Sequence, residues 1–492
     1  MGIGVGIFIV LGIACFFAFL TIKSKNNDLF KWVGIALFIA FCLTWVLPNG
    51  RFAEGEFTKD AIQRLGIFDL SSVAYYSLYF CLTTVLFLFM VGGFYGVLSK
   101  SPSYQALVKK VANFVKSKKI LVTAVLSSLI MVLVSFTGNT FAWIVFMPFL
   151  VSVLLNAKLD KMTTFATTYG SMLAGILATT YGTGSLSSFN YYVSTGLEVG
   201  LKYRLILAFI ALVAYVVFNA LVLKHKLTKK HDVESDVDLF EIEDSKTKKG
   251  ISVWYPIVVF VFLFIFTFLG LFRWAEFKID IFESFHTWLT ELQVGEDFTI
   301  MSYILGSQAA VPFGQMEVTH IMIIVLVITV ITGIVNRMSL KDFMDSFGSG
   351  FVKFVKPVCL FILSYSAFVV VYMTPITATM INWFITRTKT FNPFLTTLSG
   401  LVASFFHADL GYTGYIVGSV ITTKYEAYQA IVHTIYVSTY GIVQLLLPTS
   451  GILLFGLSYL KLDYKSWFKH IWLVAIIMIV ALIIVSCIVR YA

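Results

Sequence analysis

The chain has 492 residues, of which 59% are hydrophobic, 16% aromatic and 13% charged, and its mean hydropathy is +0.88. Soluble domains have a charged share of about a quarter, so this composition excludes an ordinary soluble globule and indicates an all-α polytopic membrane protein. The formal net charge of +10 does not indicate nucleic-acid binding, because the basic residues lie in short loops between apolar runs, where cytoplasmic enrichment explains them.

Apolar runs long enough to cross a bilayer, at roughly twenty residues per crossing, fall into two sets of five. The first set covers residues 1–22, 32–48, 73–98, 162–188 and 204–223. The second set covers residues 251–272, 316–336, 357–385, 427–460 and 471–491. Residues 1–22 lack the basic start and the small-residue cleavage site of a signal peptide, so we expect a retained span.

Two further apolar runs, residues 120–155 and 394–423, are each interrupted at the centre by polar residues. Each run has about the length of two half-crossings, so we expect two re-entrant hairpins. A re-entrant segment enters and leaves on one side, and the first run fits this because basic loops flank it: Lys116, Lys118 and Lys119 precede it, and Lys158 and Lys161 follow it. With that side cytoplasmic, most Lys and Arg residues lie inside, and both termini face outward.

Each half therefore has five spans and one hairpin, and an odd number of spans starts the second half on the opposite side. This pattern predicts two inverted repeats, residues 1–224 and 251–492, as in many secondary transporters. Residues 225–250 between them carry many lysines and acidic residues, which predicts a flexible cytoplasmic linker.

Amphipathic periodicity predicts in-plane helices at the membrane surface. Such a pattern covers residues 340–355, and another basic one covers residues 104–115. The inverted counterpart of the first is expected around residues 59–68. Gly92, Gly93 and Gly96 form a small-residue face suited to close helix packing.

Clusters of Thr, Ser, Gly, Asn and Pro interrupt both hairpins and the spans at 162–188 and 427–460, which predicts two broken helices. Unwound backbone at bilayer depth is tolerated where protein or a water-filled cavity satisfies it, so matched breaks in two halves indicate a solute site. Helix N-termini at the breaks suit a carboxylate, and Thr, Ser and Asn oxygens suit Na+. The alternative is that these small polar residues serve helix packing. The candidate substrate- or ion-binding residues are Thr137, Gly138, Asn139, Thr140, Thr183, Gly184, Ser185, His407, Asp409, Thr413, Thr449, Ser450 and Gly451, with Na+ expected near Asn139, Thr183, Ser185, Thr449 and Ser450.

Asp409 is the carboxylate expected at the tip of the second hairpin, and an ionisable group at that depth indicates a functional role. It could carry a coupling proton, bind a cation or meet a substrate ammonium. His407 lies two residues away and titrates near neutrality when unperturbed. Otherwise both residues cap the hairpin turn.

Five segments carry a recognisable pattern: Trp45 to Gly50, Gly92 to Lys100, Ser339 to Gly350, Pro448-Thr449-Ser450-Gly451 and Tyr464-Lys465-Ser466-Trp467-Phe468-Lys469. These segments resemble the four-carbon-dicarboxylate anaerobic carrier family of the ion transporter superfamily. The resemblance implies an elevator-type carrier of carboxylate-bearing metabolites, with Thr137 to Thr140, Thr183 to Ser185 and Thr449 to Gly451 lining the site. Many members carry acidic residues after the first hairpin tip, where this chain has Phe141-Ala142-Trp143-Ile144, which shifts attention to Asp409.

The sequence thus predicts a secondary transporter of the cell membrane that moves dicarboxylates or amino acids, coupled to Na+ or H+ or by exchange. A basic amino-acid antiporter of the same fold and, in another class, a channel are the alternatives. The chain has no GxxxxGK[ST], HExxH or GxSxG motif, so we expect neither an enzyme nor a cofactor other than a coupling ion. The expected partners are the lipid bilayer and a small molecule, and a homodimer is compatible with this organisation.

Overall fold

The computed structural model describes residues 29–177, 179–182, 184–228, 240, 252–294, 298–306, 310–386, 388 and 390–491. The span expected at 1–22, most of the expected linker and the candidate residue Thr183 lie outside these ranges.

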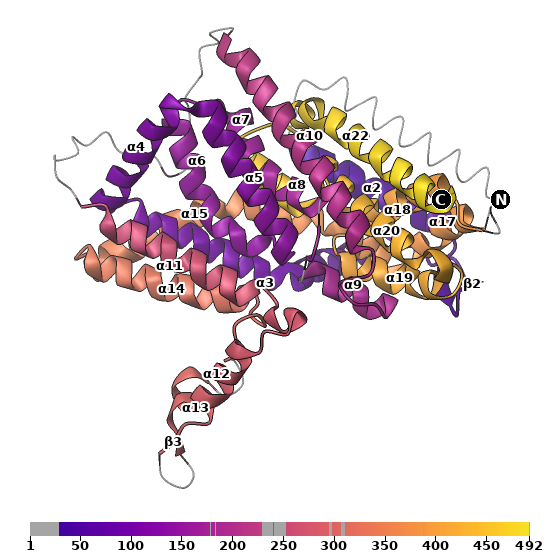
Figure 1. The fold of residues 1–492 in the computed structure, drawn as a ribbon, viewed down its shortest axis with the longest axis horizontal. Coiled ribbons are helices and arrows are strands. Elements are labelled where there is room, and N and C mark those ends of the chain that lie inside the picture. The colour runs from indigo at the N-terminus through magenta and orange to yellow at the C-terminus, as the bar shows by residue number, and fades with distance from the viewer. Residues whose placement is uncertain are drawn as a thin grey trace.

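The first half is a series of helices with one small β-hairpin (Figure 1). Its elements are α2 (Leu29–Val46), β1 (Gly50–Ala53), β2 (Glu56–Lys59), α3 (Asp69–Leu98), α4 (Pro102–Ser117), α5 (Lys119–Thr137), the 3-10 helix η1 (Phe141–Phe146), α6 (Met147–Asn156), α7 (Lys161–Phe165), the π-helical η2 (Ala166–Gly170), α8 (Ser171–Leu177), α9 (Ser185–Val193) and α10 (Leu201–Thr228).

The second half has the same character. Its elements are α11 (Trp254–Leu271), η3 (Trp274–Phe277), α12 (Ile281–Thr290), β3 (Gln293–Val294), β4 (Phe298–Thr299), α13 (Ile300–Leu305), α14 (Val318–Val335), α15 (Leu340–Ser364), α16 (Ser366–Met373), α17 (Ile376–Ile385), α18 (Pro393–Phe406), α19 (Leu410–Thr422), η4 (Glu426–Tyr428), α20 (Gln429–Leu446), α21 (Gly451–Tyr459) and α22 (Tyr464–Tyr491).

Nine helices within the described ranges are long and apolar enough to cross a membrane. Large apolar side chains stand exposed on their outer faces, such as Phe209 and Leu221 on α10, which are 68% and 60% exposed. Such exposure would be costly in water and is expected where lipid is the solvent. The prediction of an all-α polytopic membrane protein is confirmed, with two short antiparallel hairpins, β1–β2 and β3–β4, as additions.

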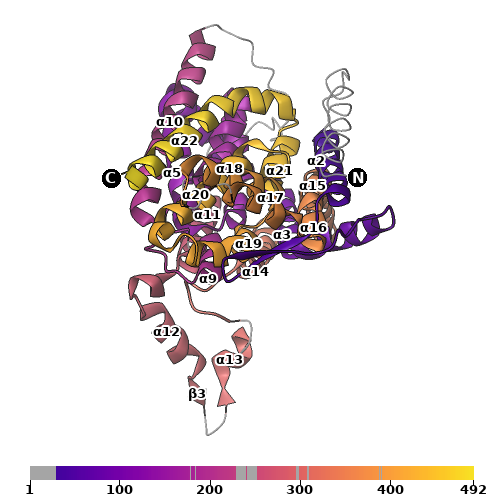
Figure 2. The same ribbon diagram turned by 90° about the vertical axis from the view of Figure 1, so that its right-hand side faces the viewer.

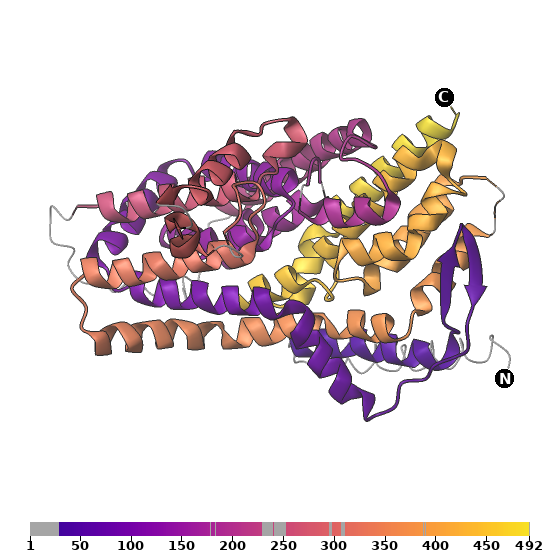
Figure 3. The same ribbon diagram turned by 90° about the horizontal axis from the view of Figure 1, so that it is seen from below.

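The predicted in-plane helix at 340–355 is wrong as a separate element, because α15 runs unbroken from Leu340 to Ser364 and passes through Pro357. The predicted span at 357–385 is instead interrupted at Tyr365 and again at Thr374 and Pro375. Tertiary packing explains why α15 continues through a proline: α14, α3 and α15 run side by side (Figure 3). A Cβ on Gly96 of α3 would lie 2.2 Å from the Ser346 carbonyl oxygen of α15, so the small-residue face of α3 permits the close contact.

The helix expected around 59–68 is also absent, because β2 ends at Lys59 and residues 60–66 are not helical. Side-chain hydrogen bonds hold this extended segment against the end of α2. Trp45 Nε1 donates to the Leu65 carbonyl at 2.8 Å, and Asn49 Nδ2 donates to Gln63 Oε1 at 2.9 Å. The third amphipathic pattern, at 104–115, does form a helix, α4.

An appendage that the sequence analysis did not predict projects from the helical body (Figure 2). It consists of η3, α12, β3, β4 and α13, and it connects α11 to α14. In the predicted topology this connection lies on the outer side.

Candidate functional site

Helices end and restart at all four of the polar clusters. In the first half, α5 ends at Thr137, where Gly138 has a left-handed conformation with φ of 64°, and α8 and α9 are separated by residues 178–184. In the second half, α18 and α19 are separated by residues 407–409, and α20 and α21 by residues 447–450.

The two breaks of the first half satisfy each other's backbone groups. Gly182 N donates to the Ser135 carbonyl at 3.0 Å, and Gly184 N donates to the Thr137 carbonyl at 3.0 Å. The Thr180 amide donates to the Ser135 side chain, again at 3.0 Å. The unwound segment is therefore docked on the turn between α5 and η1, which provides hydrogen-bond partners for backbone groups that have lost their helical ones.

Side chains cap the helices that restart in the second half. The Asp409 carboxylate accepts from Tyr412 N at 3.2 Å at the start of α19, and Ser450 Oγ accepts from Leu453 N at 3.4 Å at the start of α21. His407 is buried, and its Nδ1 lies 2.8 Å from Thr413 Oγ1. Asp409 thus caps the turn, as the alternative interpretation expected.

One cavity of about 1140 Å³ connects the breaks of the two halves. Eight of the candidate residues line it: Gly138, Asn139, Thr140, Gly184, Ser185, Asp409, Thr449 and Gly451. Four others are placed behind its wall, namely Thr137, His407, Thr413 and Ser450, which are all buried.

The starts of four helical segments, η1, α9, α19 and α21, contribute to the cavity wall. Two of these, α9 and α19, run parallel with their first turns adjacent. A Cβ on Gly414 would lie 2.9 Å from the Phe189 carbonyl oxygen, and one on Gly418 would lie 2.4 Å from that of Tyr192. Helix N-termini carry unpaired N–H groups and partial positive charge, so this wall suits an anion without any lysine or arginine in the breaks.

Two polar side chains in the wall have buried atoms without a hydrogen-bond partner. They are Thr449 Oγ1 and Gln444 Nε2, in residues that are 7% and 5% exposed. A buried polar atom left unpaired costs free energy, so such atoms mark places where a ligand can complete the bonding. The sequence analysis missed Gln444, although an amide four residues before Pro448 in an apolar run was a usable signal.

Three side chains that carry formal charge line the cavity: Asp409, Glu317 and Arg273. Glu317 caps α14, with its side chain accepting from the backbone of His320. Arg273 follows the end of α11 and is exposed. Two carboxylates and one guanidinium leave the lining with a net negative formal charge. No group of three His, Cys, Asp or Glu side chains in the described ranges could hold a metal ion.

A second polar cluster lies where the broken helix of the first half begins. Lys226 Nζ, near the end of α10, lies 2.7 Å from Asp160 Oδ2, and Asp160 also caps α7 by accepting from Thr163 N at 3.1 Å. Burial alone would raise the pKa of the Asp160 carboxyl, but the hydrogen bonds from Lys226 and Thr163 outweigh it and hold the pKa below its ordinary value.

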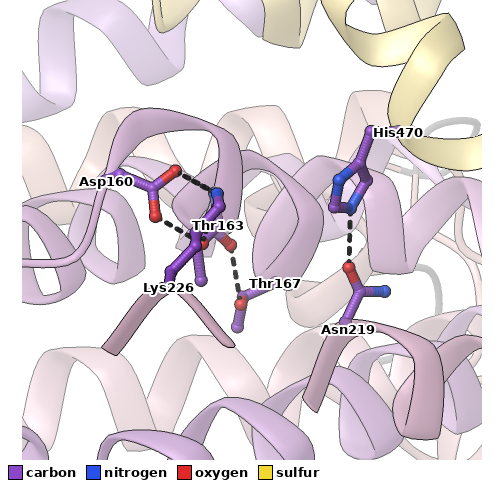
Figure 4. A network of polar contacts seen from close by, with 6 residues as sticks. All are labelled: Asp160, Thr163, Thr167, Asn219, Lys226 and His470. Carbon is purple, nitrogen blue, oxygen red and sulfur yellow. Dashed lines mark hydrogen bonds and ion pairs between the residues drawn. The ribbon is translucent and has the colours of Figure 1, made fainter. Parts of the chain in front are cut away.

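Beside this ion pair, His470 points toward Asn219, with 2.9 Å between Nε2 and Oδ1 (Figure 4). A cavity of about 10 Å³, the size of a single water, lies among the side chains of Thr123, Ser127, Thr163, Thr167, Asn219 and His470.

Comparisons with known proteins place the chain in a family. The model of the family described as C4-dicarboxylate anaerobic carrier matches residues 27–410. No curated protein matches the chain. Among solved structures, the YdaH transporter from Alcanivorax borkumensis is similar over 93% of this chain and 97% of its own, with 11% sequence identity and a TM-score of 0.36. The family match alone covers most of the described residues, and the chain belongs to the C4-dicarboxylate anaerobic carrier family.

Proposed function

We propose that the protein is a secondary active carrier of small carboxylate-bearing metabolites, with C4-dicarboxylates as the first substrate class. The observation that carries this proposal is the cavity at which four helical segments of both halves begin. The N–H groups at the starts of η1, α9 and α21 can bind the carboxylates of a substrate, as helix N-termini bind anions elsewhere, whereas Asp409 already caps α19. The family membership supports the same substrate class.

The size of the cavity supports a substrate that binds together with ions and water. Ligand pockets usually measure about 300 to 1,000 Å³, and this cavity of about 1140 Å³ exceeds the volume of a four-carbon acid. The unpartnered polar atoms of Thr449 and Gln444 are the groups in the wall that gain most from such a ligand.

The charge of the lining favours coupling to a cation. A doubly charged anion would meet a wall with two carboxylates, Asp409 and Glu317, against one guanidinium, Arg273. Binding a cation or protonating a carboxylate offsets that repulsion. Oxygen atoms of Asn139, Ser185 and Thr449 are the proposed Na+ ligands of the lining. Thr183 lies two residues before Ser185, and the hydroxyl of Ser450 already caps α21.

Amino acids are the second candidate class, and Asp409 favours them. Its carboxylate is exposed on the cavity, where it could pair with a substrate ammonium while helix N-termini bind the α-carboxylate. A basic amino-acid antiporter would use the same arrangement for exchange.

We further propose an elevator motion of the hairpins and broken helices. The broken elements of the two halves interlock closely: a Cβ on Gly441 of α20 would lie 2.2 Å from Leu177 Cα of α8. The long helices α14 and α15 both pack on α3, and α15 also packs on α21. This division supports one body that holds the cavity and another that could act as a frame.

Counterflow in proteoliposomes tests the carrier proposal. Vesicles preloaded with unlabelled succinate should take up labelled succinate faster than empty vesicles, because a carrier exchanges substrate. Equal rates would indicate a channel. A thermal-shift screen against dicarboxylates, amino acids and small peptides, with and without Na+, then separates the two substrate classes and identifies the coupling ion.

A further inference from the structure

Arg204 lies in the first turn of α10, and its side chain is 1% exposed. The guanidinium donates to three backbone carbonyls: Nε to Thr180 at 2.9 Å, Nη1 to Val199 at 2.6 Å, and Nη2 to Leu197. None of the described carboxylates forms an ion pair with it, although Glu198 acts on it at longer range. Burying a guanidinium without a carboxylate partner costs free energy, so its presence here indicates a specific role.

The imidazole of His433 joins Arg204 to the second half. Nδ1 of His433 lies 3.2 Å from Arg204 Nη1, and because a guanidinium only donates, Nδ1 accepts. The histidine is therefore neutral and protonated on Nε2, which donates to Asn190 Oδ1 on α9 at 2.6 Å. His433 belongs to α20, the helix that leads into the break before α21.

The bond to Thr180 replaces one that the broken helix has lost. In an unbroken helix the amide of residue 184 would donate to the carbonyl of residue 180. Here Gly184 N donates instead to the Thr137 carbonyl of the first hairpin. Arg204 satisfies the Thr180 carbonyl that this rearrangement leaves.

We propose that Arg204 is a positioning residue for transport. It holds the first break, the segment between α8 and α9, against the hairpin turn at Gly138, and through His433 it fixes this segment relative to α20. The cavity-lining residues Gly184 and Ser185 follow this break directly, so their position depends on it. The effect on transport rests on the proposed carrier function, whereas the effect on the break does not.

The test is amide hydrogen exchange of the purified protein over residues 179–186, together with succinate uptake by proteoliposomes. Arg204→Gln should speed exchange of the Thr180, Gly182 and Gly184 amides and raise the KM for succinate, each about tenfold or more, as loss of a charge-assisted hydrogen bond predicts. Arg204→Lys keeps the charge, but its single ammonium group cannot donate to three carbonyls as the planar guanidinium does. This variant should therefore also speed amide exchange over residues 179–186.

Tyr215→Phe is the matched control. Tyr215 is a buried residue of the same helix whose hydroxyl donates to the Ala166 carbonyl at 2.6 Å, away from the break. This variant should leave unchanged both the amide exchange over residues 179–186 and the KM for succinate. His433→Leu should give a smaller increase in exchange in the same segment, and it keeps the test available if Arg204→Gln does not fold.

Wild-type exchange at the break in Arg204→Lys and His433→Leu would overturn the proposal. Faster exchange over residues 179–186 together with a wild-type KM for succinate would overturn the claim that Arg204 affects transport. If the wild-type protein does not transport succinate but the exchange result holds, the proposed substrate falls while the positioning of the break by Arg204 stands.

Discussion

The backbone of Gly138 lies directly against the backbone of Gly182. A Cβ on Gly138 would lie 2.4 Å from the carbonyl carbon and oxygen of Gly182. Gly138 also has a φ of 64°, in the left-handed region that glycine adopts without strain. The first hairpin turn and the first break therefore meet at two glycines, and any side chain at position 138 would separate them.

Gly138→Ala should abolish transport and destabilise the protein by more than about 1 kcal/mol, because left-handed strain alone costs about that much and the clash adds to it. Uptake and the unfolding temperature measure the two effects. Gly348→Ala in α15 is the control, since a Cβ there meets nothing within 4 Å. Normal uptake by Gly138→Ala would mean that the contact between the two breaks is dispensable.

Thr449→Val should weaken substrate or ion binding without lowering stability. Thr449 Oγ1 has no hydrogen-bond partner, so its removal costs no internal bond, but it removes one from the bound state. A hydrogen bond to a charged group is worth about 1.5 to 3 kcal/mol, which corresponds to roughly ten- to over a hundredfold in affinity. Binding measured by calorimetry, with and without Na+, checks this.

The control for this variant is Thr439→Val, a residue of α20 ten positions earlier in the chain. Its hydroxyl donates to the Ile435 carbonyl at 2.8 Å, and the residue is buried. Binding should be normal in this control. Equal affinities in both variants and the wild type would assign Thr449 to packing.

Polar clusters within apolar runs were enough to predict the four breaks, because unwound backbone between apolar helices needs small and polar residues to accommodate it. The sequence could not show that α15 passes through Pro357, since the decisive contacts come from glycines of α3 on the other half of the chain. Arg204 was missed for a similar reason. Its partner His433 is 229 residues away, and only folding brings the two together.

The predicted inverted topology places the two hairpins on opposite sides of the membrane. Single cysteines at Ser117 and Thr390, in a variant without native cysteines, test this directly, because both residues are exposed next to a hairpin. An impermeant maleimide should label Thr390→Cys from outside intact cells and Ser117→Cys only after permeabilisation. Labelling of both from one side would contradict the inverted repeats.

The pair Asp160–Lys226 should stabilise the protein in a pH-dependent way. Because the pKa of Asp160 is lowered in the folded state, its contribution is present above the unfolded pKa of about 3.9 and is lost as pH falls through the folded value. Side chains that are 30% and 33% exposed limit the contribution to about 1 kcal/mol. Asp160→Asn should therefore lower the unfolding temperature at pH 7, and this effect should fade as the pH drops below the unfolded pKa and through the lowered folded pKa of Asp160.

A double-mutant cycle with Lys226→Met isolates the pair. Non-additive losses at pH 7 are expected, because each single change already breaks the same contact. Additive losses would show that the two side chains stabilise the protein independently.

Asp409→Asn should separate the charge of this residue from its role as a helix cap. Asparagine caps a helix about as well as aspartate, so the bond to Tyr412 N and the fold should be retained. If Asp409 carries a coupling proton, the variant should lose uphill accumulation but keep succinate exchange, and its uptake should depend less on pH. If Asp409 pairs with a substrate ammonium, the variant should lose amino-acid binding and keep dicarboxylate binding.

Asp463→Asn is the control, because Asp463 caps α22 by accepting from Ser466 N at 3.0 Å and does not line the cavity. It should behave as the wild type in binding and in gradient-driven uptake. The same wild-type behaviour in Asp409→Asn would leave its carboxylate with the capping role alone. The coupling charge would then have to come from Glu317, the other carboxylate that the described lining contains, or from a bound ion.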